Sequence, residues 1–104
     1  MALELDDNGY LQNLEDWDAD AAHQLAQLES VKLTSEHWEL IELTRRYYAE
    51  FDYAPAMRPL VNWIKLEAGA EKGNSIYLHK LFPVSPARQL ARVSGLPKPT
   101  KCLY

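Results

Sequence analysis

The chain has 104 residues, of which 47% are hydrophobic, and its net charge is −4. This length and composition suit one soluble globular domain with a single core, and the longest apolar runs fall far short of the roughly 20 residues that a membrane helix needs. The single cysteine excludes an internal disulfide and is typical of a reducing compartment. Because the N-terminal residues are neither basic nor strongly apolar, we expect no signal peptide and a cytoplasmic location.

The charges are unevenly distributed along the chain. Residues 1–71 contain all 15 acidic residues and five basic ones, whereas residues 72–104 contain six basic residues and no acidic residue. A basic C-terminal third attracts acidic partners and favours the thiolate form of a nearby cysteine. A split of this kind can also serve only to keep two faces of a domain soluble.

The first predicted element is a short N-terminal β-hairpin. Asn8 and Gly9 stand between two short apolar runs, and both central positions of a type I′ hairpin turn require a positive φ. A hairpin this small is not stable alone. It must therefore pack against the rest of the domain.

Five helical segments follow, each with apolar residues at helical spacing. Acidic residues support the start of the first, Thr34 or Ser35 is the N-cap of the second, and Gly69 stops the third. Pro83 ends the fourth and Pro86 opens the fifth, because proline suits a first turn and not a helix interior. The predicted helices cover residues 16–29, 34–51, 57–68, 75–82 and 86–95. The predicted fold class is mainly α, a small orthogonal helical bundle with the short hairpin.

The first two helices differ in the extent of their apolar surface. Trp17, Ala21, Leu25 and Leu28 fall on one face of the first helix. The second is apolar around more than one stripe, so we expect it to be central and to be contacted on several sides.

Residues 96–104 differ from the helical part of the chain. Pro97 and Pro99 prevent a helix and favour extended polyproline geometry, in which each residue advances about 3.1 Å. The segment that leads from the last helix to Cys102 can therefore reach on the order of 20 Å. We predict a helical domain over residues 1–95 and a mobile C-terminal arm that carries the only cysteine into another protein.

Cys102 is the strongest candidate for a functional side chain. A cysteine near a chain terminus is typically exposed, and the neighbouring cations Lys98 and Lys101 raise the fraction of reactive thiolate. A thiol on an arm has no fixed general base, so its chemistry must be completed by the protein that it enters. This suits a carrier of sulfur in the form of a persulfide. Arg88 and Arg92 are further cations that we expect to support the thiolate and partner docking.

Other kinds of site have weaker support. The three histidines and the cysteine are not spaced as zinc ligands, so we predict no metal and no cofactor, with His37 near a helix cap and His79 on a helix face. Residues 72–75 could bind an anion at a helix N-terminus, but a turn with an N-cap explains them better. The segment over residues 55–69 could belong to a nucleic-acid-binding helix-turn-helix, although its presumed recognition helix has few basic residues.

Several motifs together resemble the DsrC/TusE family of sulfur carriers. They are DNGYL at residues 7–11, HWE at 37–39, Pro55 followed by Arg58, KGNS at 72–75 with YL at 77–78, LFP at 81–83, PA at 86–87 and GLPKP at 95–99 with Cys102. The likeness covers nearly the whole chain, and the GLPKP ending with its cysteine is its most specific part. The resemblance implies a small helical bundle with a short β-hairpin and a mobile C-terminal arm.

Members of this family divide by their number of cysteines. Those that serve dissimilatory sulfite reductase carry a second cysteine eleven positions before the terminal one, where this chain has Ala91. The single cysteine therefore resembles the TusE type. The family's cysteine is typically penultimate, whereas Leu103 and Tyr104 both follow it here.

The TusE-type resemblance implies a sulfurtransferase that relays persulfide sulfur for tRNA modification. Cys102 would accept sulfur from a TusBCD-type complex and pass it to an MnmA-type thiouridylase, which makes 2-thiouridine at the wobble position of tRNA. No membrane and no cofactor are implied. The alternatives are a DsrC-like partner of dissimilatory sulfite reductase and, from another class, the nucleic-acid-binding regulator.

Overall fold

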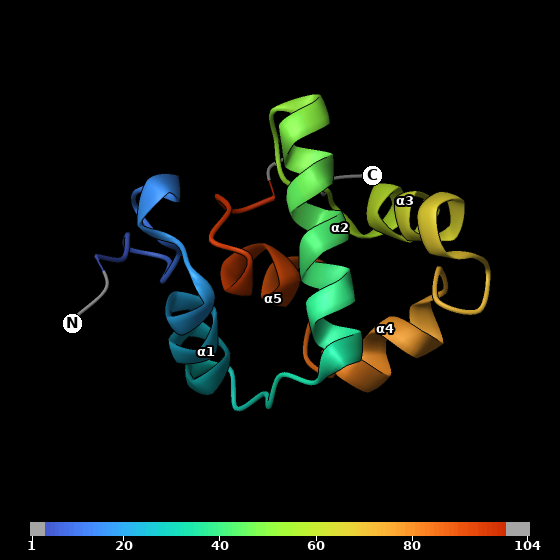
Figure 1. Ribbon diagram of the computed structural model, residues 1–104, viewed down its shortest axis with the longest axis horizontal. Helices are drawn as coiled ribbons and strands as arrows, with labels where there is room; N and C mark the ends of the chain where they lie inside the picture. Colours follow the sequence, from blue (N-terminus) through green and yellow to red (C-terminus); the bar gives the residue numbers. More distant parts are fainter. Residues whose placement is uncertain (1–3, 100–104) are drawn as a thin grey trace.

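The computed structural model describes residues 4–99, and their regular secondary structure is helical (Figure 1). The elements are a short 3₁₀ helix, η1 Leu14–Asp16, and five α-helices, α1 Ala19–Leu28, α2 Ser35–Phe51, α3 Met57–Ala68, α4 Ser75–Leu81 and α5 Pro86–Val93. The mainly α fold predicted from the sequence is confirmed. Within these residues no helix is long and apolar enough to cross a membrane.

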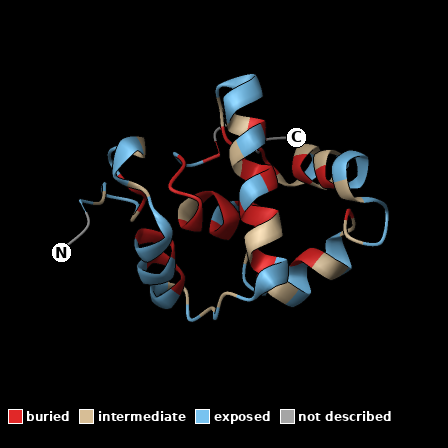
Figure 2. Cartoon of the chain, viewed as in Figure 1, coloured by how far each residue is buried: buried red, intermediate tan, exposed pale blue. Residues whose placement is uncertain are grey.

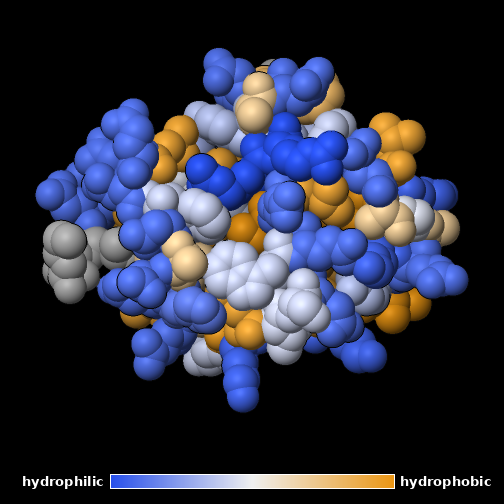
Figure 3. Space-filling view, viewed as in Figure 1, coloured by the Kyte–Doolittle hydropathy of each residue, from blue (hydrophilic) through white to orange (hydrophobic). Residues whose placement is uncertain are grey.

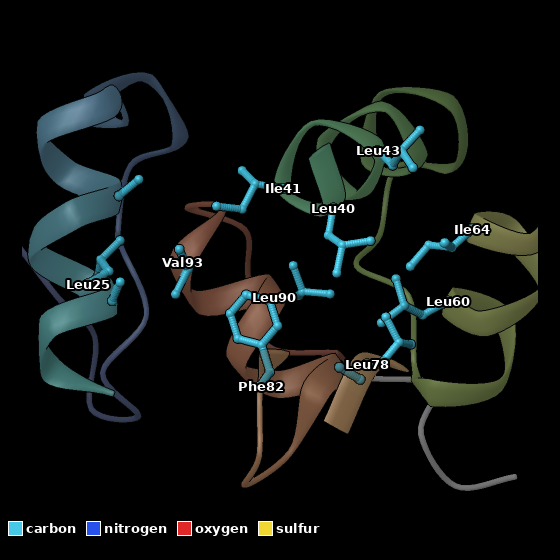
Figure 4. Packing of buried hydrophobic residues seen from close by; sticks show 13 residues of the cluster. Leu25, Leu40, Ile41, Leu43, Leu60, Ile64, Leu78, Phe82, Leu90 and Val93 are labelled. Carbon is cyan, nitrogen blue, oxygen red and sulfur yellow. The ribbon is translucent and has the colours of Figure 1, made fainter. Parts of the chain in front are cut away.

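The short helix α5 lies at the centre of the bundle, where α1, α2, α3 and α4 all pack against it (Figure 1). Leu90 and Val93 of α5 are 0% exposed and share one cluster with Leu25 of α1, Ile41 of α2 and Leu60 of α3 (Figure 4). Burial of one such side chain contributes about 1.5–3 kcal/mol. Most of α5 is therefore buried, whereas α2 lies across α5 and α3 and keeps an exposed face (Figure 2).

The prediction of an N-terminal β-hairpin is wrong. No strand forms among residues 4–99, and Leu5 and Leu11 make one isolated antiparallel bridge. Gly9 has a positive φ of 84°, but Asn8 does not, so the type I′ turn is not formed. The side chain of Asp6 instead accepts a hydrogen bond from the N–H of Asn8 at 2.9 Å. Backbone hydrogen bonds from Asp6 to the Tyr10 carbonyl oxygen at 2.7 Å and from Gln12 to the Glu4 carbonyl oxygen at 2.9 Å flank the bridge. The segment is therefore a compact hydrogen-bonded turn with a single bridge and not a ladder of two strands.

The first predicted helix, residues 16–29, is interrupted at Trp17. The 3₁₀ helix η1 ends before it, and α1 begins after Asp18, whose side chain caps the helix with a hydrogen bond of 2.8 Å. Trp17 has an extended backbone, and its Nε1 donates to the carbonyl oxygen of Val93 at 2.8 Å. Leu28, predicted to lie on the apolar face, is 58% exposed. The spacing of apolar residues could not predict the position of Trp17, because its hydrogen-bond partner, Val93, is 76 positions away in the sequence.

The remaining helices begin where the signals predict, whereas α4 ends one residue and α5 two residues before the predicted ends at 82 and 95. Thr34 is the N-cap of α2, in a capping box that His37 completes, which confirms the cap position of this histidine. The Nε2 atom of His37 also lies 2.9 Å from the carbonyl oxygen of Leu81 at the end of α4. Gly69, with a φ of 98°, ends α3, and Pro86 occupies the first turn of α5.

Candidate functional site

Two of the predicted site residues, Lys101 and Cys102, lie outside the described residues. The structure describes residues 94–99, which comprise the connection after α5 and the first four residues of the predicted arm, and which we call the arm root. Gly95 follows α5 with a φ of +73°, and the N–H of Leu96 donates to a carbonyl oxygen of α5 at 2.9 Å. This is the helix ending that glycine favours, because a positive φ costs it no steric energy. The arm root therefore starts from a defined helix terminus.

The arm root contacts the helical body. Leu96 is 1% exposed and belongs to a second core cluster. Its buried partners in this cluster are Tyr10, Ala54 and Ala91. Pro99 is also buried, whereas Pro97 and Lys98 are exposed. Lys98 is thus a solvent-facing cation four positions before the cysteine in the sequence.

Two side chains from distant elements hold the end of α5, and we call them the Trp17–Arg45 bracket. Nε1 of Trp17 donates to the carbonyl oxygen of Val93 at 2.8 Å, and Nη1 of Arg45 donates to that of Ser94 at 2.5 Å. The guanidinium of Arg45 also lies over the Trp17 ring, 4.0 Å from its centroid. Sequence reasoning missed this bracket, because no local pattern reports contacts across 76 and 49 positions.

Arg88 and Arg92 lie one turn apart on α5 in different surroundings. Arg92 donates from Nε to the carbonyl oxygen of Gly9 at 2.7 Å and pairs through Nη1 with the carboxylate of Glu29. Its side chain is only 20% exposed, and its two contacts connect α5 to the N-terminal turn and to the end of α1. Arg88 is exposed, and both arginines line a hollow of about 140 Å³. The structure brings these two predicted cations together, and Lys98 does not line that hollow.

The remaining candidates have structural roles. Asn74 caps α4 by accepting a backbone N–H at 2.8 Å, and Lys72 pairs with Glu39 of α2 at 2.5 Å. The turn with an N-cap predicted for residues 72–75 is therefore present. His79 is exposed on α4, as predicted. Over residues 4–99, no three His, Cys, Asp or Glu side chains gather as a group that could hold a metal ion.

Comparison with known proteins gives the family. Residues 1–103 match the sequence profile of the DsrC-like proteins. The chain belongs to the DsrC-like family. The match includes the arm root and Cys102, and it confirms the resemblance that the motifs carry.

Curated relatives of this DsrC-like chain are named as sulfurtransferases. The sulfurtransferase TusE homolog of Haemophilus influenzae is 50% identical over 103 residues, which cover 99% of this chain and 94% of the relative. Sulfurtransferase TusE of Photorhabdus laumondii is 48% identical over 101 residues, covering 97% and 91%. The similarity therefore extends over nearly the full length of both partners in each comparison.

Solved structures of DsrC proteins share the fold. The NMR structure of DsrC from Allochromatium vinosum matches with a TM-score of 0.87 and 46% identity, covering 97% of this chain and 90% of that one. The oxidized gamma-subunit of the dissimilatory sulfite reductase from Archaeoglobus fulgidus matches with a TM-score of 0.82 and 40% identity, covering 97% and 92%. The helical bundle of this chain is thus shared with solved DsrC structures.

Proposed function

We propose that this DsrC-like protein is a sulfurtransferase of the TusE type, which accepts sulfur on Cys102 as a persulfide and passes it on. The observation that carries the proposal is the identity of 48% and 50%, over nearly the whole chain, to proteins named sulfurtransferase TusE. The sequence holds one cysteine, so a sulfur-bearing thiol can only be Cys102.

The proposed transfer needs one thiolate and one persulfide at each step. The Cys102 thiolate attacks the outer sulfur of a donor persulfide, the bond between the two donor sulfur atoms breaks, and the donor leaves as a thiolate. Cys102 then holds the outer sulfur as its own persulfide. A thiolate of the acceptor attacks that outer sulfur and releases the Cys102 thiolate. Each step is balanced without net oxidation or reduction, so the carrier needs no cofactor.

The nearby cations support this chemistry in different ways. We assign residues 96–104 as the arm, on which Lys98 and Lys101 favour the thiolate over the neutral thiol. Arg88, which is exposed, contributes to docking of acidic partner surfaces. Arg92 acts by holding the N-terminal turn and α1 in place, because its side chain is occupied by Gly9 and Glu29.

The proposed partners follow the TusE-type relay. The donor is a TusBCD-type complex, and the acceptor is an MnmA-type thiouridylase that acts on tRNA to give 2-thiouridine at the wobble position. We propose a cytoplasmic location for this relay, since a single free thiol suits a reducing compartment. In the basic third of the sequence Lys72 and Arg92 pair with Glu39 and Glu29, so the described cations left to attract acidic protein surfaces are the exposed Lys80, Arg88 and Lys98.

A partner of dissimilatory sulfite reductase is the second candidate, because the Archaeoglobus fulgidus relative is described as a subunit of that enzyme. The two-cysteine members that the sequence resembles carry their second thiol where this chain has Ala91, which is 0% exposed on α5. With one cysteine the chain forms no internal disulfide. The persulfide relay needs one thiol only, so it accounts better for this sequence.

The test is reconstituted thiolation of tRNA. The assay combines a cysteine desulfurase, cysteine as the sulfur source, the upstream relay proteins including the TusBCD-type complex, an MnmA-type thiouridylase, ATP, tRNA and this protein. It measures 2-thiouridine by mass spectrometry of digested tRNA. We expect 2-thiouridine with the unaltered protein, none above background with Cys102→Ser, and a slower reaction with Lys98→Ala. Formation of 2-thiouridine by the Cys102→Ser protein at the unaltered rate would rule out the proposal.

A further inference from the structure

We propose that the Trp17–Arg45 bracket is a positioning device for sulfur transfer, which fixes the direction in which the arm leaves α5 and so aims Cys102 at its partner. The inference rests on the proposed function of Cys102. Trp17 and Arg45 are therefore positioning residues that act through the arm.

The bracket acts on the two carbonyl groups that precede Gly95. The last carbonyl oxygens of a helix have no partner within the helix, and here Trp17 and Arg45 supply donors to Val93 and Ser94 in succession, at 2.8 and 2.5 Å. A cation at this position also interacts favourably with the negative end of the helix dipole. Two elements remote in sequence, the η1–α1 connection and α2, thus cap α5 where the arm begins.

The same tryptophan lies against the glycine that turns the chain out of α5. A Cβ atom added at Gly95 would lie 2.4 Å from Cδ1 and 2.7 Å from Cγ of Trp17, so the indole covers the glycine directly. Gly95 also has a φ of +73°, which most residues avoid. The indole therefore contacts both the last turn of α5 and the residue at which the arm changes direction.

The stacking of Arg45 on Trp17 makes the two hydrogen bonds interdependent. The guanidinium carbon lies 4.0 Å from the ring centroid, within the range of a cation–π interaction, and burial lowers the pKa of Arg45. A partly desolvated, planar guanidinium keeps its hydrogen-bond geometry better than a flexible ammonium. Movement of either side chain would disturb the other, so the bracket behaves as one rigid unit.

The position of the arm root matters because Cys102 follows it by only three positions in the sequence. Leu96 and Pro99 are buried, so the path of the chain from α5 to Pro99 is set by the bracket together with these two residues. Reacting atoms must approach to about 3–3.5 Å, so a shift of the root by a comparable distance would remove a productive geometry. A rigid root therefore serves sulfur transfer as well as the stability of the helix end.

The bracket borders an open face of the molecule. Trp17 and Arg45 line a hollow of about 480 Å³ together with Trp38 and Ile41 of α2. Figure 3 shows this side of the molecule, with hydrophobic residues between strongly hydrophilic ones. The root is thus held from a side that solvent reaches, while the partly buried Trp17 also packs against the main core.

The test compares Trp17→Phe with the matched control Trp63→Phe. Trp63 is also partly buried, and its Nε1 donates to the carbonyl oxygen of Leu43 at 2.9 Å, so the same atoms and the same kind of hydrogen bond are lost away from the arm root. A nitroxide on Cys102, the only cysteine, attenuates the NMR signals of nearby backbone amides and maps where the arm points. Arg45→Lys is a second variant that keeps the charge but loses the planar donor.

We expect Trp17→Phe and Arg45→Lys to change the attenuation of affected amides at least twofold, whereas Trp63→Phe retains the pattern of the unaltered protein. With persulfide loaded on Cys102, the KM for an MnmA-type acceptor should rise about three- to tenfold in the bracket variants, with kcat within twofold. Transfer to dithiothreitol, which needs no aimed arm, should stay within twofold.

Unchanged attenuation in both bracket variants would overturn the inference. So would an equal rise in KM for Trp63→Phe, because the effect would then report general destabilisation. The attenuation experiment does not depend on sulfur chemistry. If the unaltered protein carries no sulfur, the proposed function fails, and the attenuation pattern still decides whether the bracket directs the arm.

Discussion

Gly73, in the connection between α3 and α4, lies against the backbone of α3, and replacing it with alanine probes how closely this connection must approach α3. A Cβ atom at this position would lie 2.3 Å from both Cα and N of Lys65. Carbon atoms in ordinary contact are about 3.5–4.0 Å apart, so the two segments would have to separate by more than about 1 Å. Because the obstacle is backbone, no change of rotamer relieves it.

The expected loss of stability is the difference between two effects. Forcing a methyl group into a closely packed site costs about 1–3 kcal/mol, and a backbone obstacle places Gly73→Ala near the upper end. The φ of Gly73 lies outside the left-handed region, so alanine also restricts the unfolded chain and recovers about 0.4–1 kcal/mol. The net loss is about 2 kcal/mol. For a chain of this size, that lowers Tm by about 9 °C.

Thermal unfolding followed by circular dichroism measures this shift. Lys65→Ala is the control, because Lys65 is exposed and its side chain beyond Cβ is not the obstacle. Lys65→Ala alone should change Tm by no more than about 2 °C, and adding it to Gly73→Ala should restore none of the loss. An unchanged Tm in Gly73→Ala, or recovery in the double variant, would refute the steric argument.

Three further predictions concern a cap, an ion pair and an ionisable hydroxyl. Asp18→Ala removes the side-chain cap of α1 and should lower the free energy of unfolding by about 1 kcal/mol in a urea titration. Arg92→Ala removes a largely buried ion pair and should lower the free energy of unfolding by about 2 kcal/mol. Arg46→Ala removes a more exposed pair and should lower it by less than about 0.5 kcal/mol, and equal losses in the two variants would contradict the assigned role of Arg92. Burial and then the hydrogen bond with Tyr53 raise the pKa of Tyr47 above its ordinary value of 10.0. The unfolded chain therefore loses this proton first, stability falls as pH rises above about 10, and Tyr47→Phe should flatten that fall in urea midpoints; an equally steep fall would exclude Tyr47 as its cause.

Helix-forming segments could be predicted from the sequence because their signals are local. Thr34, Gly69 and Pro86 mark boundaries that the structure retains, since capping and proline geometry depend on neighbouring residues only. The N-terminal turn could not be predicted in this way. Its Asn-Gly pair favours a hairpin, but the Asp6 side chain supplies a competing hydrogen bond, and the following residues are drawn into the core.

The candidate site likewise contains a part that could be predicted from the sequence and a part that could not. The motif that contains Cys102 can be recognised in the sequence, because it is a contiguous stretch of residue types. The surroundings of the arm root cannot, since Trp17 and Arg45 reach α5 only after the chain has folded. Arg92 illustrates the difference, because its charge can be read from the sequence but its engagement with Glu29 depends on how α1 packs on α5.

Persulfide formation on Cys102 is the central claim of the proposed function. The most direct measurement is intact and peptide mass spectrometry of the protein after incubation with a cysteine desulfurase, cysteine and the TusBCD-type complex, with Cys102→Ser alongside. We predict a gain of one sulfur atom on the Cys102 peptide that dithiothreitol removes and that the serine variant lacks. No gain, under conditions in which the donor complex itself is loaded with sulfur, would contradict the assignment of Cys102 as a sulfur carrier.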